Sequence, residues 1–229
     1  MATTPLLMAG LSVLILGDSH MAHPHRLSEP LYETMTAEGA SVYIEAACGN
    51  NASSYIEGGE PTNCSVEATP KEKPAFKLVP HGKPSESIQA LLAKYHPNLV
   101  VIILGDAMGG YTNDDATFPR SWIWDQASTI AEQIKSGGAS CIWVGPPYGQ
   151  DKSIFPKTPH KVERLDALLK NVVTPCYYVT SLMMGKPGEF ETEDGAHFAT
   201  VNGRSPGYDH WSKYIMTVVN YGVTHFIKH

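Results

Sequence analysis

Residues 14–20 read LILGDSH, an apolar run that ends abruptly in a small, polar turn. An apolar run that is continuous rather than alternating is typical of a strand buried on both faces, as in a parallel sheet. The turn places Ser19 at the carboxyl end of the predicted strand, and open α/β sheets bind their ligands at that edge. We therefore expect Ser19 to lie in a functional site.

Apolar runs of strand length alternate with helical patterns along the rest of the chain. The runs lie at 12–16, 42–46, 99–104, 141–144 and 177–182, and the helical patterns at 27–38, 85–94, 121–135, 160–170 and 206–221. Strands that alternate with helices predict right-handed crossovers and a parallel sheet. The predicted fold class is α/β: a three-layer α/β/α sandwich, flavodoxin-like, with about five parallel strands.

The length of the chain favours one large core. The 229 residues are 42% apolar, and we predict a single domain over residues 1–229. Residues 57–84 interrupt the alternation, because they hold two adjacent glycines, five prolines and several charges without a clear period. We interpret them as a loop-rich insertion that either shapes a substrate site or is a surface excursion pinned by Cys64.

Charge argues against a nucleic acid partner, and hydropathy argues against a membrane-spanning segment. The chain has 17 basic and 23 acidic residues, a net charge of −6, and no run of lysine and arginine that would neutralise phosphates, so we expect no nucleic acid partner. The apolar stretch at 6–16 has no cationic residue before it and leads into the turn at Ser19, so it is interpreted as a strand rather than a signal peptide. We expect no membrane span in this chain. A leader or anchor removed from it remains possible.

Four cysteines stand at positions 48, 64, 141 and 176, without the close spacing of a zinc site. Their even number allows three disulfide pairings. We favour Cys48 with Cys64 and Cys141 with Cys176, because the second pair would open two neighbouring strands. Four free buried thiols are the alternative. Disulfides would indicate an oxidising compartment, and the predicted location is periplasmic or secreted.

The sequence DGAH at 194–197 follows the last predicted strand, so its loop should return to the sheet edge that carries Ser19. A serine nucleophile needs an imidazole to accept its proton and a carboxylate to orient that imidazole. Ser19, His197 and Asp194 are therefore the candidate catalytic triad. This chemistry requires neither a cofactor nor a metal.

Gly17-Asp18-Ser19 after the first strand, together with Asp194-x-x-His197 near the C-terminus, resembles the SGNH/GDSL hydrolase superfamily. The resemblance implies the SGNH hydrolase fold and hydrolysis of acyl esters through an acyl-serine intermediate. The second block of that family supplies a glycine whose backbone N–H binds the oxyanion. Gly49 in the sequence CGNN at 48–51 matches it, and the Ser19 N–H would be the other donor.

The third block departs from the family. The family carries Gly-x-Asn-Asp, whereas residues 104–108 read LGDAM, so Ala107 stands where the oxyanion-binding asparagine is expected. Either Asn50, Asn51 or Asn113 replaces the amide, or two backbone donors suffice, or activity is low or absent. The polar loop at 109–115 is typical of a substrate-facing loop, although a surface turn explains it as well. The oxyanion and substrate-binding candidates are Gly49, Asn50, Asn51, Gly105, Asp106 and Tyr111.

The sequence HMAHPH at 20–25 suggests a metal site at first sight, but no matching carboxylate or cysteine cluster is visible, and we predict none. His20 directly follows Ser19, as in the GDSH turn of SGNH domains that act in polysaccharide O-acetylation. The resemblance thus implies acetyl groups on carbohydrate. For stacking on sugar we expect Tyr111 and either Trp122 or Trp124, whereas Trp143 and Trp211 are expected in the core.

The sequence thus predicts a serine esterase that removes acyl groups, acetyl in particular, from a carbohydrate or polysaccharide. Its expected partner is an acylated carbohydrate or another small ester. One alternative is an O-acetyltransferase, in which a sugar hydroxyl resolves the acyl-Ser19. The other is a non-catalytic carbohydrate-binding or accessory protein with a degenerate oxyanion hole, which Ala107 favours. Oligomeric state is not predicted.

Overall fold

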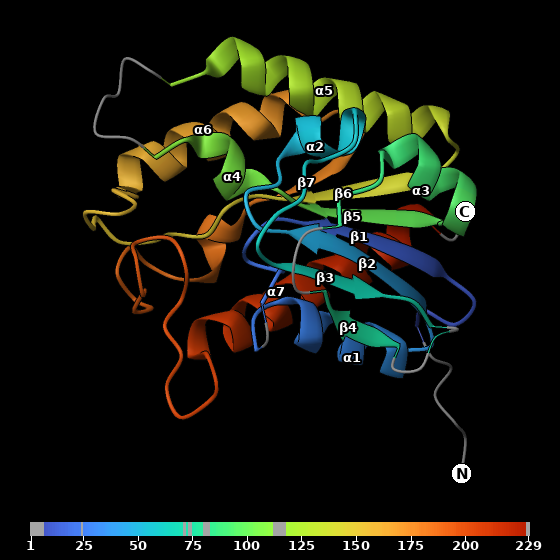
Figure 1. Ribbon diagram of the computed structural model, residues 1–229, viewed down its shortest axis with the longest axis horizontal. Helices are drawn as coiled ribbons and strands as arrows, with labels where there is room; N and C mark the ends of the chain where they lie inside the picture. The colour runs from blue at the N-terminus through green and yellow to red at the C-terminus, as the bar shows by residue number, and fades with distance from the viewer. Residues whose placement is uncertain are drawn as a thin grey trace.

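The computed structural model describes residues 7–23, 25–70, 72, 75–79, 83–111 and 118–227. Its centre is a seven-stranded sheet of order β4-β3-β2-β1-β5-β6-β7 (Figure 1). The strands are β1 (Ser12–Gly17), β2 (Ser41–Ala47), β3 (Ser65–Ala68), β4 (Phe76–Leu78), β5 (Leu99–Ile103), β6 (Ser140–Val144) and β7 (Tyr177–Val179). The run from β2 through β1, β5 and β6 to β7 is parallel, which confirms the predicted α/β class with about five parallel strands.

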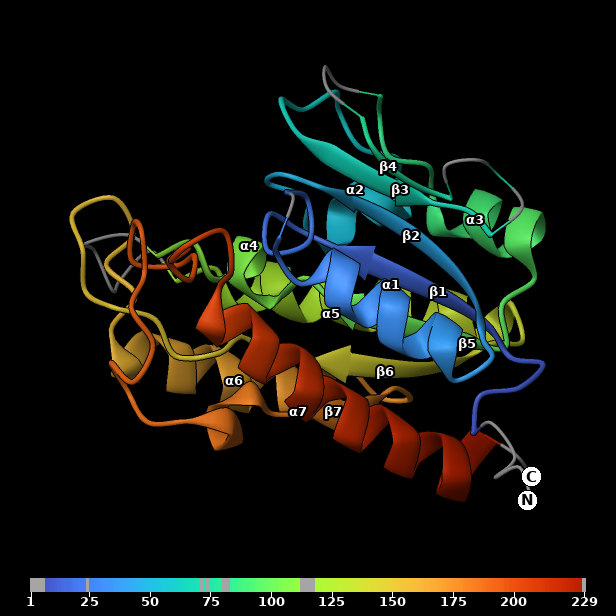
Figure 2. The ribbon, with the colours of Figure 1, turned by 90° about the horizontal axis from the view of Figure 1, so that it is seen from below.

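Helices cover both faces of the sheet (Figures 1 and 2). One layer consists of α1 (Ser28–Ala37) and α7 (Pro206–Gly222); the other contains α2 (Ala52–Ile56), α3 (Ile88–Tyr95), α5 (Arg120–Ser136) and α6 (Pro159–Val172). Short helices α4 (Gly105–Gly109), η2 (Ser181–Met184) and η3 (Val223–Ile227) complete the set described. Within the described residues, no helix has the length and apolar character to cross a membrane.

Strand β1 shows why its apolar residues form an unbroken run. It lies between β2 and β5, and its side chains alternate between two separate cores. Val13 and Ile15 pack in the layer of α1 and α7, whereas Leu14 and Leu16 pack in the opposite layer. Because both faces are covered, no position along the strand favours a polar side chain.

The segment 57–84, interpreted from sequence as a loop-rich insertion, also contains regular structure. It contains β3, which pairs antiparallel with β2 from Ala47↔Ser65 to Ile44↔Ala68, and β4, which pairs antiparallel with β3. These strands of four and three residues are too short to show a period in sequence, and their partners lie elsewhere in the chain. The end of the predicted strand at 177–182 is also different, since η2 begins at Ser181.

Both favoured disulfides are present. Cys48 and Cys64 lie just beyond the register pair Ala47↔Ser65, with their Cα atoms 5.5 Å apart. Cys141 in β6 bonds to Cys176, directly before β7, across a Cα separation of 4.6 Å. The first bond therefore lies where β2 reaches the carboxyl edge of the parallel strands, and the second lies at the opposite edge.

Candidate active site

A pocket of about 430 Å³ opens at the carboxyl edge of the sheet, beside the turn that follows β1. Its walls come from the turns after β1, β2 and β5 and from the loops that follow β6 and β7. The lining residues are Ser19, His20, His23, Arg26, Cys48, Gly49, Asp106, Ala107, Tyr111, Phe155, Asp194, Ala196 and His197. The segments that follow the five parallel strands therefore line the same pocket.

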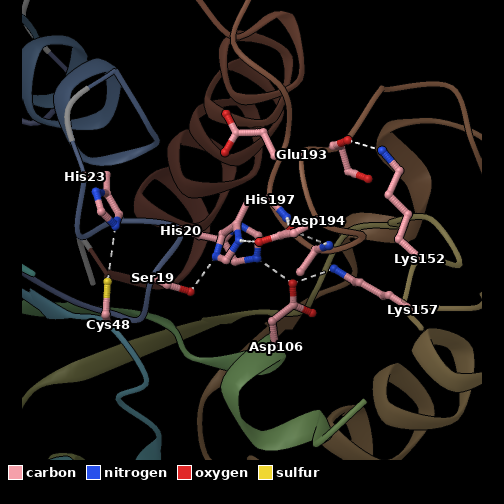
Figure 3. A network of polar contacts seen from close by, with 12 residues as sticks. Ser19, His20, His23, Cys48, Asp106, Lys152, Lys157, Glu193, Asp194 and His197 are labelled. Carbon is pink, nitrogen blue, oxygen red and sulfur yellow. Dashed lines mark hydrogen bonds and ion pairs between the residues drawn. The ribbon is translucent and has the colours of Figure 1, made fainter. Parts of the chain in front are cut away.

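Ser19, His197 and Asp194 form a continuous chain of hydrogen bonds in this pocket (Figure 3). The Ser19 Oγ lies 2.7 Å from His197 Nε2, and His197 Nδ1 lies 2.6 Å from Asp194 Oδ2. Burial acts to raise the pKa of Asp194, but hydrogen bonds from the backbone and ring of His197 hold that pKa below its usual value. An ionised Asp194 fixes the tautomer that leaves Nε2 free to accept the Ser19 proton.

The loop that carries Asp194 and His197 is braced by the loop after β6. The Gln150 amide donates to Gly195 O at 2.8 Å, and the Phe155 amide donates to Asp194 O at 3.1 Å. Gly195 has φ +107, and a Cβ there would lie 2.0 Å from Phe155 O, so only glycine fits between the two loops. This contact fixes the imidazole against Ser19.

The two predicted oxyanion donors, the backbone N–H groups of Ser19 and Gly49, belong to residues that line the pocket. The N–H groups of Ser19 and Gly49 make no hydrogen bond to any residue that the structure describes. On either side of Gly49 the turn is held, since the Cys48 amide donates to Cys64 O and the Asn50 amide donates to Ala47 O. Gly49 has φ +76, a conformation that a side chain would strain.

Three of the oxyanion and substrate-binding candidates are not brought into the pocket. The buried Asn50 donates from Nδ2 to Ser85 Oγ at 2.6 Å, and the Asn51 side chain caps α2 by accepting from the Ser53 amide. Gly105 packs against Pro146, where a Cβ would approach within 2.7 Å. Local capping and packing thus use these groups elsewhere. Asn113 lies outside the described residues.

Ala107 lines the pocket with a methyl group, and its amide points elsewhere. The Ala107 N–H donates to Asp18 Oδ2 at 3.5 Å, and Asp18 Oδ1 accepts from the His20 amide at 2.9 Å. Asp18 therefore ties the end of β1 to the start of α4. Burial, and next the charge of Asp106, raise the pKa of Asp18 to about 7.

Behind Ser19 lies a buried polar cluster that the sequence did not reveal. Asp106 accepts hydrogen bonds from His20 Nε2, from Lys157 Nζ at 2.5 Å and from the Tyr111 hydroxyl at 2.7 Å. The other ring nitrogen of His20, Nδ1, lies 2.8 Å from the Tyr208 hydroxyl. Burial acts to raise the pKa of Asp106, but Lys157 and His20 hold it well below its usual range. Lys157 and Tyr208 carry no local motif that could have identified them.

The outer wall of the pocket carries cationic and sulfur-bearing side chains. Arg26 Nη1 donates to Ser19 O at 2.7 Å, and Arg26 also lies 3.6 Å from Glu193. His23 Nε2 is 3.4 Å from Cys48 Sγ, so His23, Cys48 and Cys64 form a group of potential metal ligands. The two sulfurs are bonded to each other, which leaves no thiolate for a metal. The absence of a metal stays a prediction.

The aromatic candidates separate into two places. Tyr111 lines the pocket, and its role in stacking on sugar stays a prediction. Trp122 and Trp124 are exposed on α5 and are not part of the pocket lining. Trp143 and Trp211 are fully buried in the cores, as predicted.

Comparisons with solved structures show the same fold at low sequence identity. Esterase EstA from Pseudoalteromonas sp. aligns with a TM-score of 0.61 and 13% identity over 93% of this chain and 99% of its own. A GDSL-like lipase from Bacteroides thetaiotaomicron gives 0.59 and 15%, with 92% and 88% covered. The acetylxylan esterase Axe2 from Geobacillus stearothermophilus gives 0.58 and 12%, with 94% and 95% covered.

The chain thus has the fold of these esterases and lipases, with serine after its first strand and Asp-x-x-His after its last. No protein-family model matches it. Protein BcsX from Komagataeibacter xylinus is 33% identical over 193 residues, which cover 83% of this chain and 71% of BcsX. The chain belongs to the same family as BcsX.

Proposed function

We propose that the protein is a serine esterase that hydrolyses acyl esters, acetyl esters of carbohydrate in particular. The observation that carries the proposal is the chain of hydrogen bonds from Ser19 through His197 to Asp194 at the edge of a pocket. These groups are a nucleophile, its base and the group that orients the base, each within the reach that acyl transfer requires.

Each group has a defined step in the proposed reaction. Ser19 Oγ attacks the ester carbonyl while His197 Nε2 takes its proton, and the carbonyl oxygen becomes an oxyanion held by the N–H groups of Ser19 and Gly49. His197 then returns the proton to the leaving alcohol, which leaves an acyl-Ser19. A water molecule, deprotonated by the same Nε2, attacks the acyl-enzyme and releases the acid and free Ser19. Asp194 stays ionised and stabilises the imidazolium in both halves.

Two observations support an acetylated carbohydrate as the substrate. His20 after Ser19 gives the GDSH turn that resembles SGNH domains of polysaccharide O-acetylation, and among the structural neighbours is an acetylxylan esterase. Tyr111 adds an aromatic side chain to the pocket wall. The two disulfides support a periplasmic or secreted location, because such bonds persist in oxidising compartments.

Ala107 favours a second candidate, a carbohydrate-binding or accessory protein without turnover. The pocket has a methyl group where the family carries an oxyanion-binding amide, and neither Asn50 nor Asn51 replaces it. A fluorophosphonate probe separates the two functions: an esterase becomes labelled at Ser19, and a binding module stays unlabelled. An acetyltransferase would instead be recognised by an acetylated sugar among the products when a sugar acceptor is supplied.

Substitution of the nucleophile is the first prediction. Ser19→Ala should lower kcat/KM for p-nitrophenyl acetate by at least about 10³-fold, because no other group in the relay can form the acyl-enzyme. The thermal unfolding midpoint should stay near that of the wild type, since a turn serine contributes little packing. The matched control is Ser136→Ala at the exposed end of α5, which should leave turnover unchanged. Activity of Ser19→Ala near that of the wild type would exclude the proposed function.

A further inference from the structure

The buried cluster behind Ser19 has no part in the ester chemistry described above, although it lies against that site. Lys157 has 0% exposed side-chain area, and its ammonium group lies 2.5 Å from Asp106 Oδ2 (Figure 3). The same oxygen accepts from His20 Nε2. A buried lysine is stable in its charged form only when it is paired, and Asp106 is the carboxylate that pairs it.

His20 is buried, and burial is the main cause that lowers its pKa to about 4, so the ring is uncharged near neutral pH. Its Nδ1 lies 2.8 Å from the Tyr208 hydroxyl, which can donate to this nitrogen when it carries no proton. In that tautomer Nε2 carries the single ring proton and donates a hydrogen bond to Asp106. With Lys157 positive, Asp106 negative and His20 neutral, the three side chains sum to zero charge.

We propose that Lys157 is a positioning residue of the Ser19 site: its ammonium group neutralises Asp106, so that His20 remains an uncharged imidazole beside His197. The ring centroids of His20 and His197 are 5.1 Å apart. In the proposed reaction His197 becomes an imidazolium, and a second cation at that distance would oppose it. The effect on turnover rests on the proposed esterase function; the charge state of His20 does not.

His20 donates to the same oxygen of Asp106 as Lys157 does, so we expect His20 to replace Lys157 as the cation on Asp106 when Lys157 is lost. The side chains that face His20 or Asp106 from the packed elements are Asp18 and Ser19 after β1, Asp106 on α4, Tyr111 after α4, Lys157 before α6, His197 after β7, and Tyr208 and Trp211 on α7. Among these described neighbours Lys157 is the fixed cation on Asp106. Without it, protonation of His20 restores the balance, because the imidazole already donates to that carboxylate.

Histidine titration by NMR is the direct test, because it needs no activity. In the wild type, His20 should stay uncharged between pH 8 and pH 5.5. The variant Lys157→Met keeps a side chain of similar length but removes its charge. In this variant His20 should become protonated between pH 8 and pH 5.5. The double variant Asp106→Asn with Lys157→Met removes both charges and should return His20 to its uncharged state. A His20 that stays uncharged in Lys157→Met overturns the proposal.

Kinetics supply the second readout. Lys157→Met should lower kcat for p-nitrophenyl acetate by about 10- to 100-fold, the range expected for a like charge about 5 Å from the imidazolium, and should leave KM within about threefold. The double variant Asp106→Asn with Lys157→Met should regain at least half of the lost kcat, measured on a logarithmic scale. The matched control Lys170→Met removes an exposed ammonium group at the end of α6 and should match the wild type.

The two proposals fail in different ways. If wild type and Ser19→Ala both lack turnover and probe labelling, the esterase function fails, while the titration of His20 still decides the role of Lys157. If Lys157→Met does not fold, the double variant decides. A folded double variant with an uncharged His20 supports charge balance. A double variant that also fails to fold shows that Lys157 acts by packing, and this overturns the proposal.

Discussion

At the scale of the single residue, Ala107 lines the pocket at the position where the proposed esterase would need a third oxyanion donor. Its side chain offers no donor, and its backbone N–H is directed to Asp18 rather than to the pocket. The remaining donors are the amides of Ser19 and Gly49. An oxyanion site with two donors in place of three stabilises its transition state less, so substrate binding away from the carbonyl has to contribute more to catalysis.

Restoration of the missing amide gives the second prediction at this scale. Ala107→Asn should raise kcat for p-nitrophenyl acetate by about 10-fold or more, since one oxyanion donor contributes a few kcal/mol. Steady-state kinetics at fixed pH would measure the gain, with Ala107→Leu as the control that adds similar bulk without an amide. The wild type should also show a much higher kcat/KM on an acetylated oligosaccharide than on this small ester. If Ala107→Asn raises kcat but the wild type shows no preference for the oligosaccharide, substrate binding does not compensate for the missing oxyanion donor.

The sequence predicts those site residues that lie in a recognisable local motif, and it does not predict those that reach the site only through tertiary packing. The chain segment around Ser19 and the segment of Asp194 and His197 each combine a predicted strand end with reactive residue types, so sequence alone indicated that they meet. Lys157 and Tyr208 reach the site through tertiary packing, and nothing in their neighbours distinguishes them from surface residues. Asn50 was a plausible donor by residue type, but its amide is used by Ser85.

At the scale of the element, β2 and β3 bring acidic side chains together. Glu45 on β2 is in register with Glu67 on β3, and the buried Glu45 carboxylate accepts from the Glu86 amide. Burial raises the pKa of Glu45 to about 7, and the hydrogen bond from Glu86 opposes that effect only in part. Since the pKa of Glu45 is higher in the folded state than in the unfolded chain, its contribution to stability is greatest below about pH 4.5 and is lost as the pH rises through 7.

The third prediction uses this pH window. Glu45→Gln removes the buried charge and keeps an oxygen for the Glu86 amide. At pH 8 it should raise the free energy of unfolding by about 2 to 3 kcal/mol, and at pH 4.5 it should have little effect. Urea unfolding at both pH values checks this, with Glu57→Gln, whose side chain is exposed, as the control. A gain of equal size at the two pH values would contradict titration of Glu45 as the cause.

The sequence predicts long helices and strands more clearly than short ones. The parallel strands β1, β2, β5 and β6 and the five long helices each span enough residues to show an apolar run or a helical period, whereas the run that indicated β7 continues beyond the three residues of that strand. Helices α2 and α4 have five residues each, and β3 and β4 have four and three. Elements this short are stabilised by contacts with distant partners, as when β3 adds its hydrogen bonds to β2, so local sequence does not predict them.

At the scale of the whole molecule, the two disulfides are at opposite edges of the parallel strands. In the first bond, Cys48 precedes Gly49 and lines the pocket, whereas Cys141–Cys176 joins β6 to the residue before β7, away from the pocket. Both bonds constrain the unfolded chain, and each typically contributes about 2 to 4 kcal/mol to stability. Only the first of them also lies next to Gly49, whose backbone N–H is the proposed oxyanion donor.

The fourth prediction follows from this asymmetry. Two double variants replace the cysteines of one disulfide each by serine. Each should lower the free energy of unfolding by about 2 to 4 kcal/mol. The Cys48/Cys64 pair should in addition lower kcat for p-nitrophenyl acetate, because the turn of Gly49 loses its anchor, while the Cys141/Cys176 pair should keep wild-type kcat below its melting range. Mass spectrometry of the unreduced protein confirms each linkage beforehand. Equal losses of kcat in the two variants would exclude a role of the first bond in the pocket.

The bond between His197 and Ser19 joins positions 178 residues apart. During synthesis the nucleophile therefore emerges long before its base, and no nascent chain that ends before His197 holds both. For the esterase proposed above, this order of emergence delays activity until the chain has folded. While the chain is being made or transported in an unfolded state, its serine is an ordinary alcohol, and the esters of the producing cell are exposed to a competent nucleophile only after the two ends of the fold have met.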